Sequence, residues 1–464
     1  MLIRNATLAD GRVRDVRIED EEIVEVGSGL DAEGDDGDAP GESAGRDVVD
    51  APGESAGRDV VDAEENLLLP GAIDVHVHFR EPGFSHKETW ETGSKSAAAG
   101  GVTTVVDQPN TDPPTTTGAA FDEKAALAVR SLVDYGINGG VTDDWDPASL
   151  FDRPLFALGE VFLADSTGDM GVEASLFRDA VERAAEADVP VTVHAEDADL
   201  FDESVRPRRT DAAGGERRDP RADTNARDDA DAWSAYRRAE AEVAAVERAV
   251  EVGGDAGAAL HIAHTSTPEA VDVLTGTDVT CEVTPHHIFL SRDDLSELGT
   301  FGRMNPPLRS ERRRETLFDR VADGTVDVVA TDHAPHTREE KAAGIWDAPS
   351  GVPGVETMLP LLLAAAERGD LSYERVRDVT ARNPARIFDL PRKGAVAAGH
   401  DADLALYDPS AGREIRGEEL HSKCEWTPFE GLDGVFPEWT MVRGRVVYDA
   451  ETGFADGRGE NVRT

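Results

Sequence analysis

The chain has 464 residues and carries 94 acidic side chains against 47 basic ones, which gives a formal net charge of −47. A negative field of this size repels phosphate groups and so argues against nucleic acid and anionic membrane surfaces as partners. The length allows one large domain of about 300 residues and a smaller one beside it, because single cores stop growing at roughly 250 to 300 residues.

The composition also predicts where the protein works. Only six of the basic residues are lysines, and such an excess of carboxylates is typical of cytosolic proteins from salt-loving microbes. The two cysteines, Cys281 and Cys424, lie far apart and form no C-x-x-C motif, which fits a reducing cytosol. The N-terminus lacks the apolar core of a signal peptide, and the longest apolar run, residues 358–366, is too short to span a bilayer. We therefore expect a soluble cytoplasmic protein.

Residues 1–67 are expected to form the first part of a small β domain. Apolar and polar residues alternate with period two in short runs through residue 30, as they do in half-buried strands. Residues 31–62 interrupt this pattern with Gly, Asp, Glu and Ser, and residues 39–50 recur unchanged at 51–62. One duplication is too few copies for a repeat architecture, so we interpret this segment as an acidic surface loop.

Residues 68–390 change to short β-branched runs that alternate with amphipathic segments. Eight runs are expected as strands: residues 72–77, 103–107, 135–139, 155–162, 191–194, 260–264, 279–283 and 326–331. The expected helices include residues 89–99, 121–132, 173–187, 232–252 and 312–322. This alternation predicts an α/β fold of the TIM-like (β/α)8 barrel type, for which ~250 residues are typical and insertions are common. Residues 200–231, rich in Arg and Asp, are expected to be one acidic insertion.

The last part of the chain, residues 391–464, returns to short strand-like runs. They lie at 401–408 and 439–449 and resemble the N-terminal segment in pattern. We expect the N- and C-terminal segments to pair in one small β domain beside the barrel.

Polar residues collect where the predicted barrel strands end. The segment IDVHVHFREPG at 73–83 places His76 and His78 on the same face of an extended strand, directly before a turn. The other strand-end residues are Glu160, His194, His264 and Asp332. Barrels of this type build their active sites at the C-terminal ends of the strands, so these side chains are expected to converge. Packed structural histidines have no reason to fall there, and we interpret the set as a site for zinc or a similar divalent ion, with enough ligands for two ions.

Seven motifs, taken in order, resemble those of the dihydroorotases in the amidohydrolase superfamily. They are DVHVHFREPG at 74–83, DQPNT at 107–111, VHAE at 193–196, HIAHTS at 261–266, EVTPHH at 282–287, MNPPLR at 304–309 and TDHAPH at 331–336. The resemblance covers nearly the whole chain apart from the acidic insertions. It implies the reversible cyclisation of N-carbamoyl-L-aspartate to dihydroorotate in pyrimidine synthesis, on a zinc centre in a TIM-like barrel.

The resemblance also implies roles for single residues. The metal ligands that it implies are His76, His78, His194, His264 and Asp332, and Asp332 is also the catalytic group that takes up and returns the proton. The substrate contacts that it implies are Arg80, Asn110, Asn305 and His336. We also expect His78 and the segment that begins at Ser350 and Gly351, close after the eighth strand, to line the substrate pocket.

These roles suit the chemistry of a cyclic amide. Its hydrolysis needs a nucleophile stronger than water, which a metal-activated hydroxide provides. Arg80 offers a planar guanidinium to the substrate carboxylate, and its ordinary alternative is a salt bridge within the fold. Asn110 and Asn305 could equally be turn residues beside their prolines.

One position departs from the commoner pattern of the family. Many relatives bridge two metal ions with a carbamylated lysine on the fourth strand, but this chain has no lysine between Lys124 and Lys341. Glu160 occupies that place, and we predict that its carboxylate is the bridge. Asp165, slightly later in the same loop, is the alternative.

Two other functions stay open. A related cyclic amidase, such as an allantoinase or hydantoinase, would share the metal site, although Arg80 argues against a neutral ring as substrate. A non-catalytic scaffold of the same fold is less expected, because every expected ligand is present. The resemblance further implies a homodimer. The other histidines near the mouth are expected only to support the ligands through hydrogen bonds: His86, His286, His287 and His333. His261 is expected to pack on His264 or to orient it.

Overall fold

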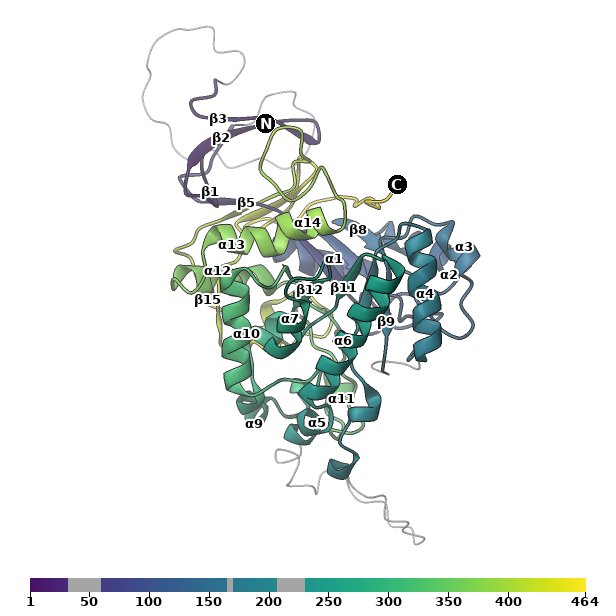
Figure 1. Ribbon diagram of the computed structural model, residues 1–464. Helices are drawn as coiled ribbons and strands as arrows, with labels where there is room; N and C mark the ends of the chain where they lie inside the picture. The colour runs from purple at the N-terminus through teal and green to yellow at the C-terminus, as the bar shows by residue number, and fades with distance from the viewer. Residues whose placement is uncertain (32–59, 165–169, 207–229) are drawn as a thin grey trace, which may run out of the picture.

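The structure is a computed structural model that describes residues 1–31, 60–164, 170–206 and 230–464. Within these residues, eight parallel strands form a barrel at the centre of the molecule (Figure 1). They are β6 (Ala72–Val77), β7 (Val102–Asp107), β8 (Asp134–Ile137), β9 (Leu158–Phe162), β10 (Val191–His194), β11 (Leu260–Ile262), β12 (Thr280–Val283) and β13 (Val328–Val329). Backbone bridges between Gly139 and Leu158 and between Val77 and His333 join β6–β8 to β9–β13 on both sides. The prediction of a (β/α)8 barrel is confirmed.

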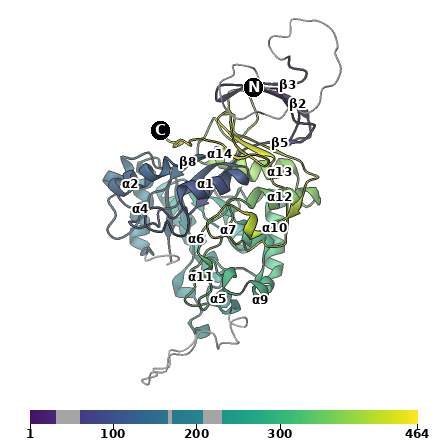
Figure 2. The ribbon, with the colours of Figure 1, turned by 180° about the vertical axis from the view of Figure 1, so that it is seen from behind.

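Helices cover the outside of the barrel (Figures 1 and 2). The longer ones are α1 (Trp90–Ala99), α2 (Gly118–Ala128), α4 (Ala174–Glu186), α5 (Ala230–Tyr236), α6 (Ala239–Ala256), α7 (Pro268–Leu274), α10 (Glu311–Asp323) and α12 (Met358–Glu367). The shorter ones are α3 (Pro147–Phe151), α8 (Pro285–Phe289), α9 (Leu295–Leu298), α11 (Arg338–Lys341), α13 (Tyr373–Arg377) and α14 (Asn383–Ile387). Local sequence sets where several begin, since Thr89 and Thr92 form a capping box at α1 and Thr267 caps α7.

The segment 232–252, expected to be one helix, belongs to two. Helix α5 ends at Tyr236 and α6 begins at Ala239, because Arg238 has an extended backbone with φ −65° and ψ 153°. Arg237, at the break, buries its guanidinium against Glu196 just after β10. This buried ion pair accompanies a break that helical periodicity does not reveal.

The two ends of the chain share one sheet. Across that sheet its strands are β19 (Gly453–Phe454), β18 (Arg445–Asp449), β17 (Trp439–Val442), β14 (Leu404–Tyr407), β5 (Leu67–Pro70), β1 (Leu2–Leu8), β2 (Val13–Glu19) and β3 (Glu22–Gly27), with β4 (Val60–Asp62) paired to β1. Strand β5 lies parallel to β1 and antiparallel to β14, so it joins N-terminal and C-terminal strands directly. Ile3, Leu68 and Met441 are among the buried side chains of its core. The expected small β domain is confirmed.

This end sheet and the functional end of the barrel lie on opposite sides. Figure 1 shows the sheet above the barrel with both chain ends beside it, and α5, α9 and α11 at the far end. Strand β5 leads directly into β6, so the sheet adjoins the N-terminal ends of the barrel strands. The strands β15 (Arg413–Glu414) and β16 (Asp433–Gly434) form a separate antiparallel pair. The C-terminal strand ends are therefore left for the loops that carry chemistry.

Parts of the sequence prediction lie outside the described residues. They are residues 32–59 of the acidic duplicated loop, residues 207–229 of the insertion, and Asp165, the alternative bridge. The domain limits at 67/68 and 390/391 stay predictions. In the described part of the chain, no helix combines the length and the apolar character needed to cross a membrane.

A buried cation ties the end sheet to the barrel. Lys393 Nζ donates to Asp134 Oδ2 at 2.8 Å, at the start of β8, and to Asp403 Oδ2 at 2.6 Å, beside β14. Arg443 binds the other oxygen of Asp134 at 2.6 Å. Burial alone would lower the pKa of Lys393, but the two carboxylates raise this pKa well above its usual range. The lysine is therefore charged where it joins the two parts of the fold.

Removing this cation should destabilise the protein strongly. We expect Lys393→Met to lower the free energy of unfolding by about 3 to 5 kcal/mol, because Asp134 and Asp403 stay buried without it. The control Lys95→Met breaks an exposed pair with Glu91 and should cost at most about 0.5 kcal/mol. Urea unfolding of both variants in concentrated salt measures the difference. Equal losses in the two variants would contradict the role given to Lys393.

Candidate active site and metal centre

The six predicted metal ligands meet at the C-terminal end of the barrel strands. They are His76 and His78 at the end of β6, Glu160 in β9, His194 at the end of β10, His264 after β11 and Asp332 after β13. Each is at most 6% exposed. Buried histidines and carboxylates gathered at one mouth are the arrangement that the strand-end pattern predicts.

Glu160 lies at the centre of this group. Its Oε1 is 2.5 Å from His264 Nε2 and 3.0 Å from His194 Nδ1. Its Oε2 is 3.3 Å from His76 Nε2. One carboxylate therefore faces imidazoles from three different strands.

Asp332 occupies the other side of the same group. Its Oδ1 is 2.9 Å from His78 Nε2 and 3.6 Å from His76 Nε2. His76 Nε2 is buried between two carboxylates, yet it makes no hydrogen bond to the described residues. A buried nitrogen with no hydrogen bond, surrounded by imidazole and carboxylate donors, fits a zinc-type divalent cation. Five of the six ligands form two overlapping groups that share His76, one with Glu160 and His264 and the other with His78 and Asp332.

Charge within the group favours ionised ligands. Burial alone would raise the pKa of Glu160, but the imidazoles of His264 and His76 hold this pKa well below its usual range. Burial opposes ionisation of Asp332 too, and the hydrogen bond from His78 is the main cause that lowers its pKa. Both carboxyl groups are therefore ionised at neutral pH, as metal ligands must be.

A layer of carboxylates behind the histidines is absent from the sequence prediction. Glu282 in β12 accepts a hydrogen bond from His76 Nδ1 at 2.5 Å and one from the backbone N–H of His264 at 3.1 Å. Glu196 lies 3.0 Å from His194 Nε2 and is bound in turn by Arg237. Such partners fix the ring orientation of a ligating histidine. The available signal was a carboxylate inside the apolar strand Thr280–Val283.

The supporting histidines act partly through this layer. His261 was expected to pack on or orient His264, but its Nε2 lies 3.2 Å from Glu282 Oε2. Any influence on His264 therefore passes through Glu282. His333 Nδ1 accepts the backbone N–H of Gly354 and so holds the loop after β13.

The predicted substrate residues surround one cleft beside the metal ligands. Six of the seven line it: His78, Arg80, Asn110, Asn305, Ser350 and Gly351. The seventh, His336, lies behind them, with Nε2 at 2.9 Å from the carbonyl of Ser350 and 3.2 Å from Arg80 Nη2. His336 therefore contacts two residues of the cleft wall without lining it.

Arg80 is a buried cation without a carboxylate partner. It is 2% exposed, and among the described residues it forms no ion pair within 4 Å. Its neighbours are the carbonyl of Pro335, at 3.3 Å from Nε, and His336. Burial lowers its pKa to about 10, which leaves it charged at neutral pH. An unpaired buried charge is costly, so the cleft is built to receive an anion at this point.

Lys341 holds the loop that contributes Ser350 and Gly351 to the cleft. Its Nζ donates to the carbonyls of Arg303, Pro349 and Gly351 at 2.9, 3.0 and 3.1 Å. The lysine is fully buried, and this burial keeps its pKa well below the usual range. Three donated bonds fix the backbone of the loop that presents Ser350 and Gly351.

Backbone strain is concentrated at the same mouth. Arg80, His264 and Asp332 have φ values of 65°, 34° and 46°, in the left-handed region that residues other than glycine rarely adopt. Each stands where a barrel strand passes into its loop. Strain of this kind clusters at functional sites, where the surrounding structure holds it.

Comparisons with known proteins agree with this geometry. Residues 67–447 match the model of the amidohydrolase family. The chain is 65% identical to the dihydroorotase of Halobacterium salinarum over 464 residues, which cover 100% of this chain and 99% of the relative. It is 44% identical to the dihydroorotase of Methanosarcina acetivorans over 413 residues, 86% of this chain and 85% of the relative.

A solved structure shares the fold at lower identity. L-Hydantoinase from Arthrobacter aurescens has a TM-score of 0.84 and 27% identity, over 99% of this chain and 98% of that one. The dihydroorotases match more residues over a comparable length. The chain therefore belongs to the amidohydrolase family and, within it, to the dihydroorotases.

Proposed function

We propose that the protein catalyses the reversible closure of N-carbamoyl-L-aspartate to (S)-dihydroorotate and water, a step of pyrimidine synthesis. The observation that carries the proposal is Arg80, a buried guanidinium without a carboxylate partner among the described residues, beside the clustered ligands. Dihydroorotate carries a carboxylate, and a guanidinium can bind a carboxylate through two parallel hydrogen bonds.

We propose that the six ligands hold two zinc ions and that Glu160 is shared between them. Its contacts with His76, His194 and His264 support this, as does the second contact of His76 with Asp332. When bound, a divalent cation polarises the substrate carbonyl and acidifies water. Glu282 and Glu196 keep the ligating rings oriented for it.

Asp332 is proposed as the general base and acid. In the hydrolytic direction, water adds to the ring carbonyl carbon and Asp332 takes a proton from that water. The ring C–N bond then breaks, and Asp332 gives the proton to the leaving nitrogen. In the synthetic direction the same steps run in reverse and release water. The low pKa of Asp332 and its 2.9 Å contact with His78 support this role, because the base must start ionised and held in place.

The cleft residues are proposed to orient the substrate. Asn110 Oδ1 lies 2.7 Å from His78 Nδ1, so its amide nitrogen is the atom that it can offer to a substrate oxygen. Trp233 Nε1 donates to Asn305 Oδ1 at 3.0 Å and fixes that side chain. The loop held by Lys341 and His336 presents Ser350 and Gly351 to the same cleft. Such fixed contacts position the reacting atoms before the chemical step.

Three further features are proposals of the same kind. The acidic composition supports a protein adapted to concentrated salt. Two free buried cysteines support a cytoplasmic location. A homodimer rests on the family resemblance alone.

Substrate comparison tests the function. The purified protein should turn over dihydroorotate and leave hydantoin and allantoin unchanged, because the neutral rings carry no carboxylate for Arg80 to bind.

Substitution of Arg80 tests the same contact. In Arg80→Gln, kcat/KM for dihydroorotate should fall about 100-fold or more. A buried hydrogen bond to a charged group is worth about 1.5 to 3 kcal/mol, and loss of the substrate's orientation lowers the rate further. Arg178→Gln, an exposed arginine paired with Asp255, is the matched control. Turnover of the neutral rings alone would place the protein with the cyclic amidases, and no turnover with metal bound would favour a scaffold.

Substitution of Glu160 tests the shared ligand. We expect Glu160→Ala to lose at least one bound metal ion and about 1000-fold in turnover, because cation stabilisation is worth several kcal/mol. Glu173→Ala, at an exposed position before α4, should change neither. Metal content by elemental analysis and turnover of dihydroorotate measure both effects. Full metal content and full activity in Glu160→Ala would refute the assignment.

A further inference from the structure

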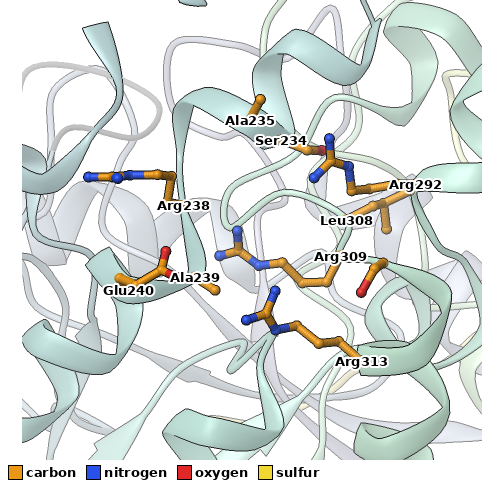
Figure 3. Close-up of a pocket in the computed structure, with 10 residues that line it drawn as sticks. Ser234, Ala235, Arg238, Ala239, Glu240, Arg292, Leu308, Arg309 and Arg313 are labelled. Atoms are coloured by element: carbon orange, nitrogen blue, oxygen red, sulfur yellow. The ribbon is translucent and has the colours of Figure 1, made fainter. Parts of the chain in front are cut away.

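A second cavity lies outside the catalytic cleft. Its volume is about 240 Å³, smaller than the roughly 300 Å³ at which pockets for drug-sized ligands begin. Among the described residues that line it, four are arginines and one, Glu240, is acidic (Figure 3). The arginines are Arg238, Arg292, Arg309 and Arg313. In a chain with twice as many acidic as basic residues, the side chains that line this cavity are mostly basic.

Two of the arginines form fixed parts of the wall. Arg309 is buried and donates to Ser266 Oγ at 2.9 Å, to Glu242 Oε2 at 3.1 Å and to a backbone carbonyl at 2.5 Å. Arg292 makes paired bonds with Asp231. These contacts hold both side chains in place, so a ligand need not order them.

The other two arginines have donors left for a ligand. Arg238 has no carboxylate within 4 Å among the described residues, but its Nε and Nη2 donate to the carbonyl of Leu200, and Figure 3 shows its guanidinium pointing away from those of Arg309 and Arg313. Arg313 engages Glu269 through Nε alone, at 3.0 and 3.2 Å. A guanidinium has five N–H donors, so most of those on Arg238 and Arg313 remain for another acceptor.

Two helices begin at the cavity and strengthen its preference for anions. Arg238 precedes the 18-residue helix α6 and Ser310 precedes the 13-residue helix α10, and both residues line the cavity. Neither gives its helix a side-chain cap. The first backbone N–H groups of a helix lack intrahelical partners, and they add to the attraction that the arginines already provide.

We propose that this cavity binds a phosphate group, either free phosphate or that of a small phosphorylated metabolite. Arginine forks and helix starts both recognise a tetrahedral, multiply charged oxyanion. Figure 3 shows Arg309 and Arg313 reaching from the α10 side toward the start of α6. One phosphate group placed between these side chains and the start of α6 would therefore contact both walls.

Calorimetry of the full-length protein tests the proposal. Inorganic phosphate and glycerol phosphate are titrated separately at constant ionic strength, set with potassium chloride. We expect saturable binding of one phosphate per chain and an affinity at least tenfold lower in Arg238→Gln/Arg313→Gln. Arg178→Gln, an exposed arginine outside the cavity, should bind as the unchanged protein does. If the double variant does not fold, Arg313→Gln alone serves, because Figure 3 shows that side chain reaching toward the start of α6 and its Nη donors are not used by Glu269.

The outcomes separate clearly. Tighter binding of the ester assigns the site to a phosphorylated metabolite, and tighter binding of inorganic phosphate assigns it to the free ion. Binding that is equal in the double variant and the unchanged protein would place the phosphate elsewhere, for example at the metal centre, and would overturn the proposal. No saturable binding of either probe would overturn it as well.

Discussion

The carboxylate of Glu160 among three buried imidazoles is the interaction on which the rest of the structure depends. Ionised groups are stable inside a protein only where opposite charges and hydrogen bonds surround them. Here that requirement extends outward, because His194 is held by Glu196, and Glu196 by Arg237. The position of Arg237 coincides with the break between α5 and α6. The buried charge of Glu160 is therefore balanced through a chain of contacts that ends at Arg237, between two helices on the outside of the barrel.

The two ends of the barrel serve different purposes. At the N-terminal ends of the strands, Lys393 joins the end sheet to β8 through fully paired charges. At the C-terminal ends, Arg80 is left without a carboxylate among the described residues, and left-handed backbone is held in place. Paired charges stabilise a fold, whereas an unpaired buried charge beside a cleft prepares it for a ligand. The contrast agrees with the usual division of labour in barrels of this type.

Much of the site was visible in the sequence, for a definite reason. The His-x-His pair and the later strand-end residues are marked by their position, because parallel strands bring their C-terminal ends to one mouth. Glu282 begins the motif at 282–287, but its contact with His76 was not predicted, since a single carboxylate in a short strand looks like ordinary alternation. The break before α6 was also missed, because the ion pair that accompanies it joins Arg237 to a partner 41 residues away. The arginine-lined cavity joins residues from three separate segments, a proximity that no local pattern encodes.

Metal-dependent catalysis at the barrel mouth is tested most directly by turnover of dihydroorotate by the purified protein in concentrated salt, before and after exhaustive chelation and after zinc is returned. We expect activity to disappear on chelation and to recover with zinc, because the clustered histidines and carboxylates act through a bound cation. Unchanged activity in protein shown by elemental analysis to contain no metal would contradict it.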